Sequence, residues 1–386
     1  MNYNFDNIIN RKGTNSIKYD FALEMNKPEG LLPMWVADMD FSTAPEILED
    51  LQKTVKHGIF GYSEPKEDYY NAVINWFNTR YDYLVQPNEI IRSPGLVNGI
   101  TQAVCALTKP NDAVIIQTPV YYPFYDIINN NNRTLVCNSL RYEDGKYTID
   151  FTDFEQKIVE NKVKMFILCS PHNPVGRVWT RFELEEMNRI CVNHNVIVVS
   201  DEIHCDLVWN SHKHYCFGLL NDNAIIATSP SKTFNLAGLK VSNLIVKNEE
   251  IRHKLNEEIT RGGAGRINTL GIIACKSAYT KGDAWLEALK LYLHDNIQLV
   301  QTFLESRIPQ IKLIDPQAMY LLWLDFSEYQ LSQDELEKKI IEEAKLWLNN
   351  GTIFGKEGNG FQRINIACPR KTVVNALERL GKTFCN

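Results

Sequence analysis

The sequence predicts an α/β protein with a mostly parallel β-sheet, helices on both faces of that sheet, and a smaller α+β domain. Four short apolar runs bounded by turn-forming residues have the pattern of strands buried on both faces. A helical pattern lies between two of these runs, and repeated strand–helix–strand units favour a parallel sheet. The four predicted strands are 113–117, 163–169, 196–200 and 224–228.

The clearest helix is predicted between the second and third strands, over 180–193. Thr180 and Glu183 stand three residues apart, which is the spacing of a capping box. An apolar stripe with helical spacing follows them. The stripe consists of Leu184, Met187, Ile190 and Cys191. A second helix is predicted over 96–107, just before the first strand.

The last hundred residues have a different organisation. Amphipathic helices are predicted over 284–301 and 333–348, and strands over 319–325 and 361–367. Runs of helix and strand that do not alternate regularly are typical of an α+β domain. The asparagine run at 129–132 is predicted to be a solvated turn.

Length, charge and cysteine usage limit the class of protein. A chain of 386 residues can bury a large core, most naturally as two domains. The formal net charge is -6 and the cations are scattered, so the sequence indicates no positively charged surface for binding nucleic acid. No apolar run approaches a membrane span, and the first residues lack the regions of a signal peptide. The nine cysteines show no zinc spacing, so we expect reduced thiols, no metal site and a cytoplasmic location.

Lys232 lies just after the fourth predicted strand, at the sheet edge where ligands bind in such folds. Burial and the nearby cation Lys240 both favour a neutral amine, which can form a Schiff base. Ser229 and Ser231 add hydroxyls that suit a phosphate. A ligand with an aldehyde and a phosphate fits this pattern, and pyridoxal phosphate (PLP) has both. The alternative is a surface lysine in a polar loop.

Two further polar residues follow predicted strands at the same edge. Asp201 ends the third strand, where a buried carboxylate needs a cationic partner such as a protonated pyridine nitrogen. It could instead cap a helix that begins at Glu202. Asn173 could donate to a phenolate oxygen, or it could only form the turn of an Asn-Pro-x-Gly sequence.

Several other positions are candidates for binding. Gly95 and Leu96 open the helix over 96–107, and free N–H groups at a helix N-terminus suit a phosphate, although this is also how any helix starts. Arg363 has the side chain best shaped to grip a carboxylate, unless it is an exposed strand arginine. Tyr121 or Tyr122 could stack on a planar ring, or these aromatics could pack in the core.

These residues lie in longer motifs that resemble the fold-type I PLP enzymes, the aminotransferase class I/II superfamily. Within that superfamily the chain is similar to the MalY/PatB group of cystathionine β-lyases, also called carbon–sulfur lyases. The similarity covers nearly the whole chain. It is carried by the opening at 5–20 and by the motifs WVADMDF (35–41), HGIFGY (57–62), SPHNPVGRVW (170–179), DEIHCDLV (201–208) and GFQRINIACPR (360–370).

The resemblance implies roles for the residues that hold the cofactor. Lys232 would form the Schiff base and move protons, Asp201 would pair with the pyridinium, and Asn173 would bond the ring oxygen. Tyr121 would stack on the ring, and His204 stands where many members of the superfamily have tyrosine. The phosphate would be held by Ser229, Ser231, Lys240 and the backbone of Gly95 and Leu96.

The resemblance also implies a substrate site and a partner. Arg363 would bind the α-carboxylate of an amino acid, together with Asn173 and backbone near Ala37. Tyr62 would reach the phosphate of the neighbouring subunit's cofactor, so the enzyme would be a homodimer with shared sites. Tyr62 and Tyr121 are therefore placed beside Lys232 among the catalytic residues.

The implied fold has a seven-stranded sheet in a large PLP-binding domain over 46–283. An N-terminal segment over 1–45 would contribute to the small domain and the active site, and the small domain would cover 284–386. The implied activity is α,β-elimination from L-cystathionine, L-cysteine and related β-thio amino acids, giving a thiol such as homocysteine or hydrogen sulfide, pyruvate and ammonia. An aminotransferase on the same scaffold is the alternative, and a non-catalytic PLP-fold partner protein is a third hypothesis.

Overall fold

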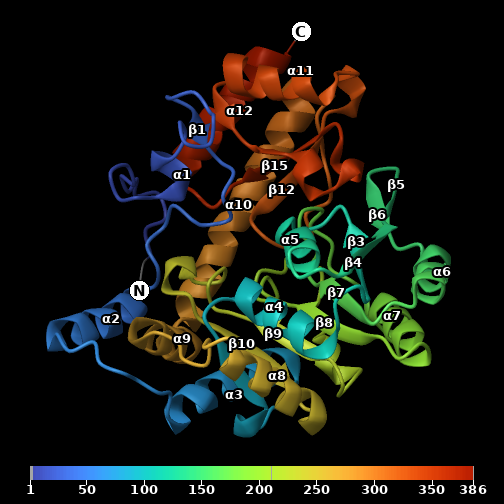
Figure 1. The fold of residues 1–386 in the computed structure, drawn as a ribbon. Helices are drawn as coiled ribbons and strands as arrows, with labels where there is room; N and C mark the ends of the chain where they lie inside the picture. Colours follow the sequence, from blue (N-terminus) through green and yellow to red (C-terminus); the bar gives the residue numbers. More distant parts are fainter. Residues whose placement is uncertain (1–2, 210, 386) are drawn as a thin grey trace.

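The computed structural model describes residues 3–209 and 211–385, and its largest element is a seven-stranded sheet (Figure 1). Five of its neighbouring strands run parallel, while β10 is antiparallel to both of its neighbours. The fold class predicted from the sequence is thus confirmed. In spatial order the strands are β2 (Ile90–Ser93), β10 (Ser242–Val246), β9 (Ile225–Thr228), β8 (Ile197–Asp201), β7 (Met165–Cys169), β3 (Ala113–Thr118) and β4 (Thr134–Ser139).

Each of the four predicted strands is present, displaced by no more than two residues at either end. Every residue of β3, β7 and β9 is buried, as expected for strands covered on both faces. Successive side chains of a strand point to opposite faces, so Val114 and Ile116 of β3 join one apolar core and Ala113 and Ile115 join another.

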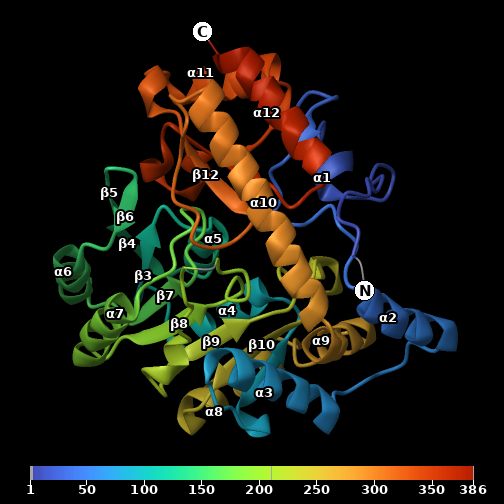
Figure 2. The same cartoon turned by 180° about the vertical axis from the view of Figure 1, so that it is seen from behind.

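Helices cover both faces of this sheet (Figures 1 and 2). One core is closed by α4 (Leu96–Leu107), α5 (Pro123–Asn129) and α8 (Glu249–Arg261). The other is closed by α3 (Glu67–Tyr81), α6 (Phe151–Asn161), α7 (Arg181–Asn193) and α9 (Thr269–Lys281). The predicted capping box is confirmed, because the Thr180 side chain accepts from the N–H of Glu183 and the Glu183 carboxylate accepts from the N–H of Thr180.

A second, smaller sheet lies beyond the large one. The long helix α10 (Asp283–Arg307) runs from the large sheet to the small one, as Figure 2 shows. The small sheet is antiparallel, and α12 (Arg370–Phe384) packs near it. Its strands, in spatial order, are β11 (Lys312–Leu313), β12 (Leu321–Asp325), β15 (Phe361–Asn365) and β14 (Asn349–Asn350). A separate hairpin consists of β5 (Arg141–Glu143) and β6 (Lys146–Thr148).

The helix predicted over 333–348 is wrong in its second half. Helix α11 covers only Gln333–Lys338 and passes into one π-helical turn that ends at Glu343. Lys345 then adopts the left-handed conformation, with φ of 53°, which breaks a helix. The strand β13 (Leu346–Trp347) follows and pairs with β1 (Leu32–Pro33). The consecutive apolar residues 346–348 suit a buried strand. A helix with one buried face would instead have apolar residues at every third or fourth position.

The N-terminal residues pair with β13 through β1, in a two-stranded sheet that is separate from the small sheet. They also form α1 (Ile17–Asp20) and α2 (Pro45–His57). The domain boundaries after residues 45 and 283 stay a prediction. Among the helices that the structure describes, none combines the length and the apolar character needed to cross a bilayer.

Candidate active site

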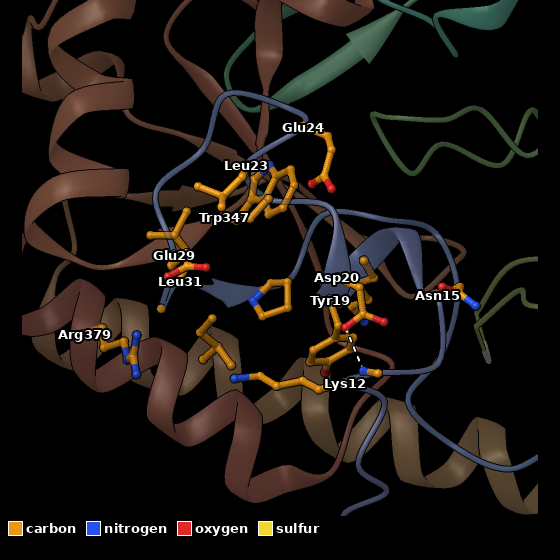
Figure 3. A pocket seen from close by; sticks show the side chains of 16 residues that line it. Lys12, Asn15, Tyr19, Asp20, Leu23, Glu24, Glu29, Leu31, Trp347 and Arg379 are labelled. Atoms are coloured by element: carbon orange, nitrogen blue, oxygen red, sulfur yellow. Dashed lines mark hydrogen bonds between the residues drawn. The ribbon is translucent and has the colours of Figure 1, made fainter.

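A cavity of about 480 Å³ lies at the carboxyl ends of the central strands. Cys169 at the end of β7 and Asp201 at the end of β8 both line it, which is where ligands bind in open α/β sheets. Nine residues predicted from the sequence line this one cavity: Ala37, Leu96, Tyr121, Asn173, Asp201, His204, Lys232, Lys240 and Arg363. A larger cavity of about 960 Å³ lies between the N-terminal segment and Trp347 (Figure 3), and it contains none of them.

Lys232 lies in the loop after β9, partly buried, with its amine inside the cavity. Its Nζ donates a hydrogen bond of 2.7 Å to the carbonyl oxygen of Ala37. Burial lowers the pKa of Lys232 to about 8, and the nearby Arg363 cation acts in the same direction against the opposing effect of Asp38. A substantial fraction of the amine is therefore neutral near neutral pH, and it can act as a nucleophile or base.

Asp201 is a buried carboxylate that forms no ion pair with any residue the structure describes. It is 3% exposed, and its one hydrogen bond within the described residues comes from the N–H of Ile203, at 3.1 Å. Burial raises the pKa of Asp201 to about 7. The helix-cap alternative is wrong, because turns follow Asp201 rather than a helix. The site thus holds a buried acid that a cationic ligand would ionise.

Arg363 is fixed by hydrogen bonds at the opposite wall. It is 3% exposed, so the alternative of an exposed strand arginine is wrong. Its guanidinium donates to Oδ1 of Asn173 at 2.8 Å, to Oδ1 of Asn349 at 2.5 Å and to the carbonyl of Trp35 at 3.1 Å. Burial lowers the pKa of Arg363 to about 10, so it stays a cation at neutral pH. No carboxylate within the described residues forms an ion pair with it, which leaves its charge available to an anionic ligand.

The opening of α4 lies beside Lys240. Gly95 has φ of 96°, a conformation that side chains rarely adopt, and a Cβ added there would lie 3.6 Å from the Cδ atom of Lys240. Leu96 and Lys240 both line the cavity, so a helix N-terminus and a cation meet at one end of it.

Ser229, Ser231 and Gly95 are not among the residues that line the cavity. The Ser229 hydroxyl donates to the carbonyl of Val241 at 2.6 Å and accepts from the N–H of Ser231 at 3.1 Å. These bonds brace the loop that carries Lys232, so the direct phosphate contacts expected of both serines stay a prediction.

Two aromatic residues predicted for the site, Tyr121 and His204, line the cavity. Tyr121 lines the wall and meets Phe124 edge-on at 5.7 Å between ring centres. His204 is 3% exposed, and its Nδ1 is buried without a hydrogen-bond partner in the described part of the chain. Burial, then the cations Lys232 and Arg363, hold the pKa of His204 well below its usual value. The imidazole is therefore neutral at the pH of the cell.

Tyr62 lies outside this cavity. Its side chain is 95% exposed, and it lines a separate hollow with Phe60 and Thr269, where the Arg266 guanidinium lies 5.1 Å from its ring centre. The structure of one chain therefore does not bring Tyr62 to Lys232.

Other residues line the cavity that the sequence reasoning did not single out for the site, among them Ile17, Met25, Trp35 and Asn349. Trp35 lies in the quoted motif at 35–41 and stacks on Trp347 with ring centres 4.5 Å apart. Asn349 lies in the region predicted to follow a helix, so no local signal pointed to it. Ile17 lies in the quoted opening at 5–20, where it begins α1, and Met25 lies in the turns that follow this helix.

Comparison with known proteins assigns this site to a family. The model described as aminotransferase class I and II matches residues 31–380. The chain belongs to the aminotransferase class I and II family. This membership confirms the superfamily that the sequence motifs resemble, and it agrees with the lysine, aspartate and arginine that the fold brings to one cavity.

Family members with a known name resemble the chain over almost its full length. Cystathionine beta-lyase PatB of Bacillus subtilis is 42% identical over 381 residues, covering 98% of each chain. Protein MalY of Escherichia coli is 33% identical, covering 95% of each.

Solved structures of the family have the same fold. The structure of cystalysin from Treponema denticola, which contains a pyridoxal 5'-phosphate cofactor, has a TM-score of 0.96 at 37% identity and covers 99% of each chain. The PLP-bound C-S lyase from Staphylococcus hominis has a TM-score of 0.94 at 34% identity, covering 100% of this chain and 99% of that one.

Proposed function

We propose that this protein is a PLP-dependent carbon–sulfur β-lyase that acts on L-cystathionine, L-cysteine and related β-thio amino acids. The observation that carries the proposal is one cavity that holds a lysine with a lowered pKa, a buried carboxylate and a buried arginine, and neither charged group has an ion-pair partner among residues 3–209 and 211–385. Relatives at 42% and 31% identity bear the name cystathionine beta-lyase.

The cavity fits PLP on the evidence of its own unpaired groups. Asp201 lacks a cation, and a protonated pyridine nitrogen would supply one. The side-chain NH2 of Asn173 has no acceptor within the described residues and could donate to the ring oxygen. Lys240 and the N-terminus of α4 would hold the phosphate, and Tyr121 would lie against the ring. Bound there, PLP would supply an electron sink that makes the α-proton of an amino acid more acidic.

Side chains of the protein would then have separate roles in the reaction. Arg363 binds the substrate α-carboxylate with its unpaired charge, and Asn173 and Asn349 keep the guanidinium in place. Lys232 takes the α-proton in its neutral form, which its lowered pKa makes more populated than in an ordinary lysine, and positioned bases of this kind contribute about 10² to 10⁴ in rate. The negatively charged Asp201 carboxylate would lie beside the protonated ring nitrogen and stabilise its positive charge. The overall reaction adds water and releases a thiol, pyruvate and ammonia.

We also propose a cytoplasmic homodimer, with Tyr62 completing the site of the second copy. Ile59, Phe60 and Tyr62 are 70%, 58% and 95% exposed, and such clustered apolar surface commonly marks an interface. Sedimentation of the pure protein should give twice the monomer mass. A Phe60→Asp variant should sediment as a monomer and bind PLP more weakly, whereas a monomeric wild type would contradict the dimer.

The test of the activity is to supply L-cystathionine or L-cysteine without a keto acid. Pyruvate formed in equal amounts to the released thiol supports the lyase. Absence of pyruvate, with amino transfer once a keto acid is added, would establish the aminotransferase instead. If neither reaction occurs and PLP binds, the non-catalytic hypothesis gains support.

A further inference from the structure

The amine of Lys232 and the guanidinium of Arg363 both bond to carbonyl groups of one short segment, residues 35–41. Lys232 donates to the carbonyl of Ala37 at 2.7 Å, and Arg363 donates to the carbonyl of Trp35 at 3.1 Å. The two side chains belong to different sheets, since Lys232 follows β9 of the large sheet and Arg363 lies on β15 of the small one. Segment 35–41 therefore bridges the base and the carboxylate-binding group of the proposed site.

Segment 35–41 forms neither helix nor strand, so its backbone groups belong to no regular ladder. Buried carbonyl and N–H groups need hydrogen-bond partners, and in an irregular segment partners from elsewhere in the chain decide its shape. Two asparagines contribute such partners here. One comes from the small sheet beside Arg363, and the other comes from the loop that carries Lys232.

Asn365 holds the middle of segment 35–41 from the small sheet. It is 1% exposed and lies two residues after Arg363 on β15, so both side chains point to the same face of that strand. Its Nδ2 donates to the carbonyl of Val36 and, at 2.6 Å, to the carbonyl of Asp38. These two carbonyls flank that of Ala37. Asn365 therefore fixes the carbonyl to which the lysine donates, from the strand that carries the arginine.

Asn235 holds the end of segment 35–41 from the lysine loop. It stands three residues after Lys232 and has φ of 57°, a left-handed conformation that asparagine adopts more readily than most residues. Its Oδ1 accepts from the N–H of Met39 at 3.0 Å, and its Nδ2 donates to the carbonyls of Met39 at 3.0 Å and Phe41 at 2.9 Å. These three bonds tie the lysine loop to the same segment that Asn365 holds.

We infer that Asn235 and Asn365 are positioning residues, which hold segment 35–41 so that it sets the separation between Lys232 and Arg363. Neither asparagine is among the residues that line the cavity, so each acts through the segment rather than on a ligand. This inference rests on the proposed function, because that function assigns the lysine to the α-proton and the arginine to the α-carboxylate.

A fixed separation of these two groups has a consequence for ligand choice that a change in overall stability would not produce. In an α-amino acid one carbon lies between the amino group and the carboxylate, and in a β-amino acid two carbons do. Misplacement of a bound group by about 1 Å can cost about 100-fold in rate, so a fixed lysine–arginine separation suits one of these spacings better than the other. A loosened segment should accept both about equally.

The experiment compares binding of L-alanine and β-alanine to the PLP-loaded protein, measured by its change in visible absorbance. The two compounds are isomers with the same charged groups, and neither carries a thiol to eliminate. They differ in the spacing between the amino group and the carboxylate. Wild type should bind L-alanine at least about tenfold more tightly than β-alanine.

Asn365→Ala removes the donor to Val36 and Asp38, and Asn235→Gly removes the three bonds at the end of the segment while still allowing the positive φ. Each variant should weaken L-alanine binding by about tenfold and change β-alanine binding by less than about threefold, so most of the preference for L-alanine is lost. Because the two asparagines lie in different parts of the fold, either variant tests the inference if the other does not fold.

The matched control is Asn296→Ala. Asn296 is 0% exposed on α10, and its Nδ2 donates to the carbonyls of Ile366 and Cys368, both at 3.1 Å. It is thus another buried asparagine that bonds two backbone carbonyls, but these carbonyls lie outside segment 35–41. Its replacement should lower the stability of the protein, measured by chemical denaturation, and leave the preference for L-alanine unchanged.

A preference for L-alanine that is unchanged in the variants overturns the positioning role, and so does an equal loss of preference in Asn296→Ala. A wild type that binds the two isomers equally also overturns it. Pyruvate formation from L-cysteine by wild type tests the proposed function separately. If wild type forms pyruvate while the variants keep the preference, the positioning role fails and the lyase stands. If neither isomer changes the absorbance of wild type and no pyruvate forms, the proposed function itself fails.

Discussion

The side-chain oxygen of Asn173 accepts a hydrogen bond of 2.8 Å from the guanidinium of Arg363, and this bond joins the two sheets of the protein across the cavity. Asn173 follows β7 in the large sheet, and Arg363 lies on β15 in the small one. Both side chains are 3% exposed. A residue that follows a strand of the large sheet thus orients Arg363, the cation that we propose binds the substrate carboxylate.

Replacing Arg363 with lysine should raise KM for amino acids by about 10- to 100-fold while PLP affinity changes less than threefold. Lysine keeps the charge, but it cannot reproduce the planar, forked set of donors that Arg363 directs at Asn173, Asn349 and a carboxylate. Steady-state kinetics and PLP titration measure the two effects. A normal KM would move the carboxylate site elsewhere.

Replacing Asp201 with asparagine should have opposite effects on stability and activity. In the cofactor-free protein the folded pKa of Asp201 is raised to about 7, so ionisation of this carboxyl opposes folding. This loss of stability is absent below the unfolded pKa of about 4. It increases with pH and reaches its maximum above pH 7. Asp201→Asn should therefore raise the free energy of unfolding by up to about 4 kcal/mol at pH 8 and by almost nothing at pH 4.

The same variant should lose at least about 100-fold in kcat with PLP bound, because the neutral amide cannot pair with a cationic ring nitrogen. Denaturant unfolding of the cofactor-free protein at pH 4 and pH 8, beside kinetics of the loaded one, separates the two effects. An Asp201→Asn protein that is both less stable at pH 8 and fully active would contradict the assignment.

Capture of PLP by the cofactor-free protein should depend on pH through Lys232. Only the neutral amine attacks an aldehyde, and burial lowers the pKa of Lys232 to about 8. The rate should rise about tenfold per pH unit below 8 and level off above it. Stopped-flow absorbance between pH 6 and pH 9.5 measures this profile, and Lys232→Ala is the control that should show no such phase. A rate still rising steeply at pH 9.5 would indicate an unperturbed lysine.

Replacing Asp40 with alanine should lower the free energy of unfolding by about 3 kcal/mol, because it leaves the buried amine of Lys18 without its nearest acid. Chemical denaturation measures the loss. The matched control is Glu49→Ala, which removes an exposed partner of Lys53 and should cost under about 0.5 kcal/mol. Equal losses in the two variants would show that the Lys18–Asp40 pair has no special role.

Much of the fold and the centre of the site could be predicted from the sequence. Strands buried on both faces have a strong local pattern, which predicts β3, β7, β8 and β9. Asp201 and Lys232 could be predicted as site residues because they lie at or just after the ends of β8 and β9. Helix α7 was found because its capping box and apolar stripe are local too.

The parts that were missed depend on contacts between distant segments. The turn at Lys345 and the pairing of β1 with β13 are set by tertiary packing, so no local pattern indicates that the helix predicted over 333–348 stops early. Asn349 lies opposite Arg363 because β14 pairs with β15, and Ile17 lines the cavity from a short helix whose Lys18 bonds the distant Asp40. Tyr62 lies apart from the cavity within one chain, and its predicted role needs a second copy.

The central claim is that Lys232 holds PLP covalently at the edge of the large sheet. The most direct measurement is borohydride reduction of the PLP-loaded protein, followed by protease digestion and mass spectrometry of the peptides. A pyridoxyl group on the peptide that contains Lys232, and its loss in Lys232→Ala, is the predicted result. Labelling of another lysine, or a wild-type peptide that stays unmodified, would contradict the account.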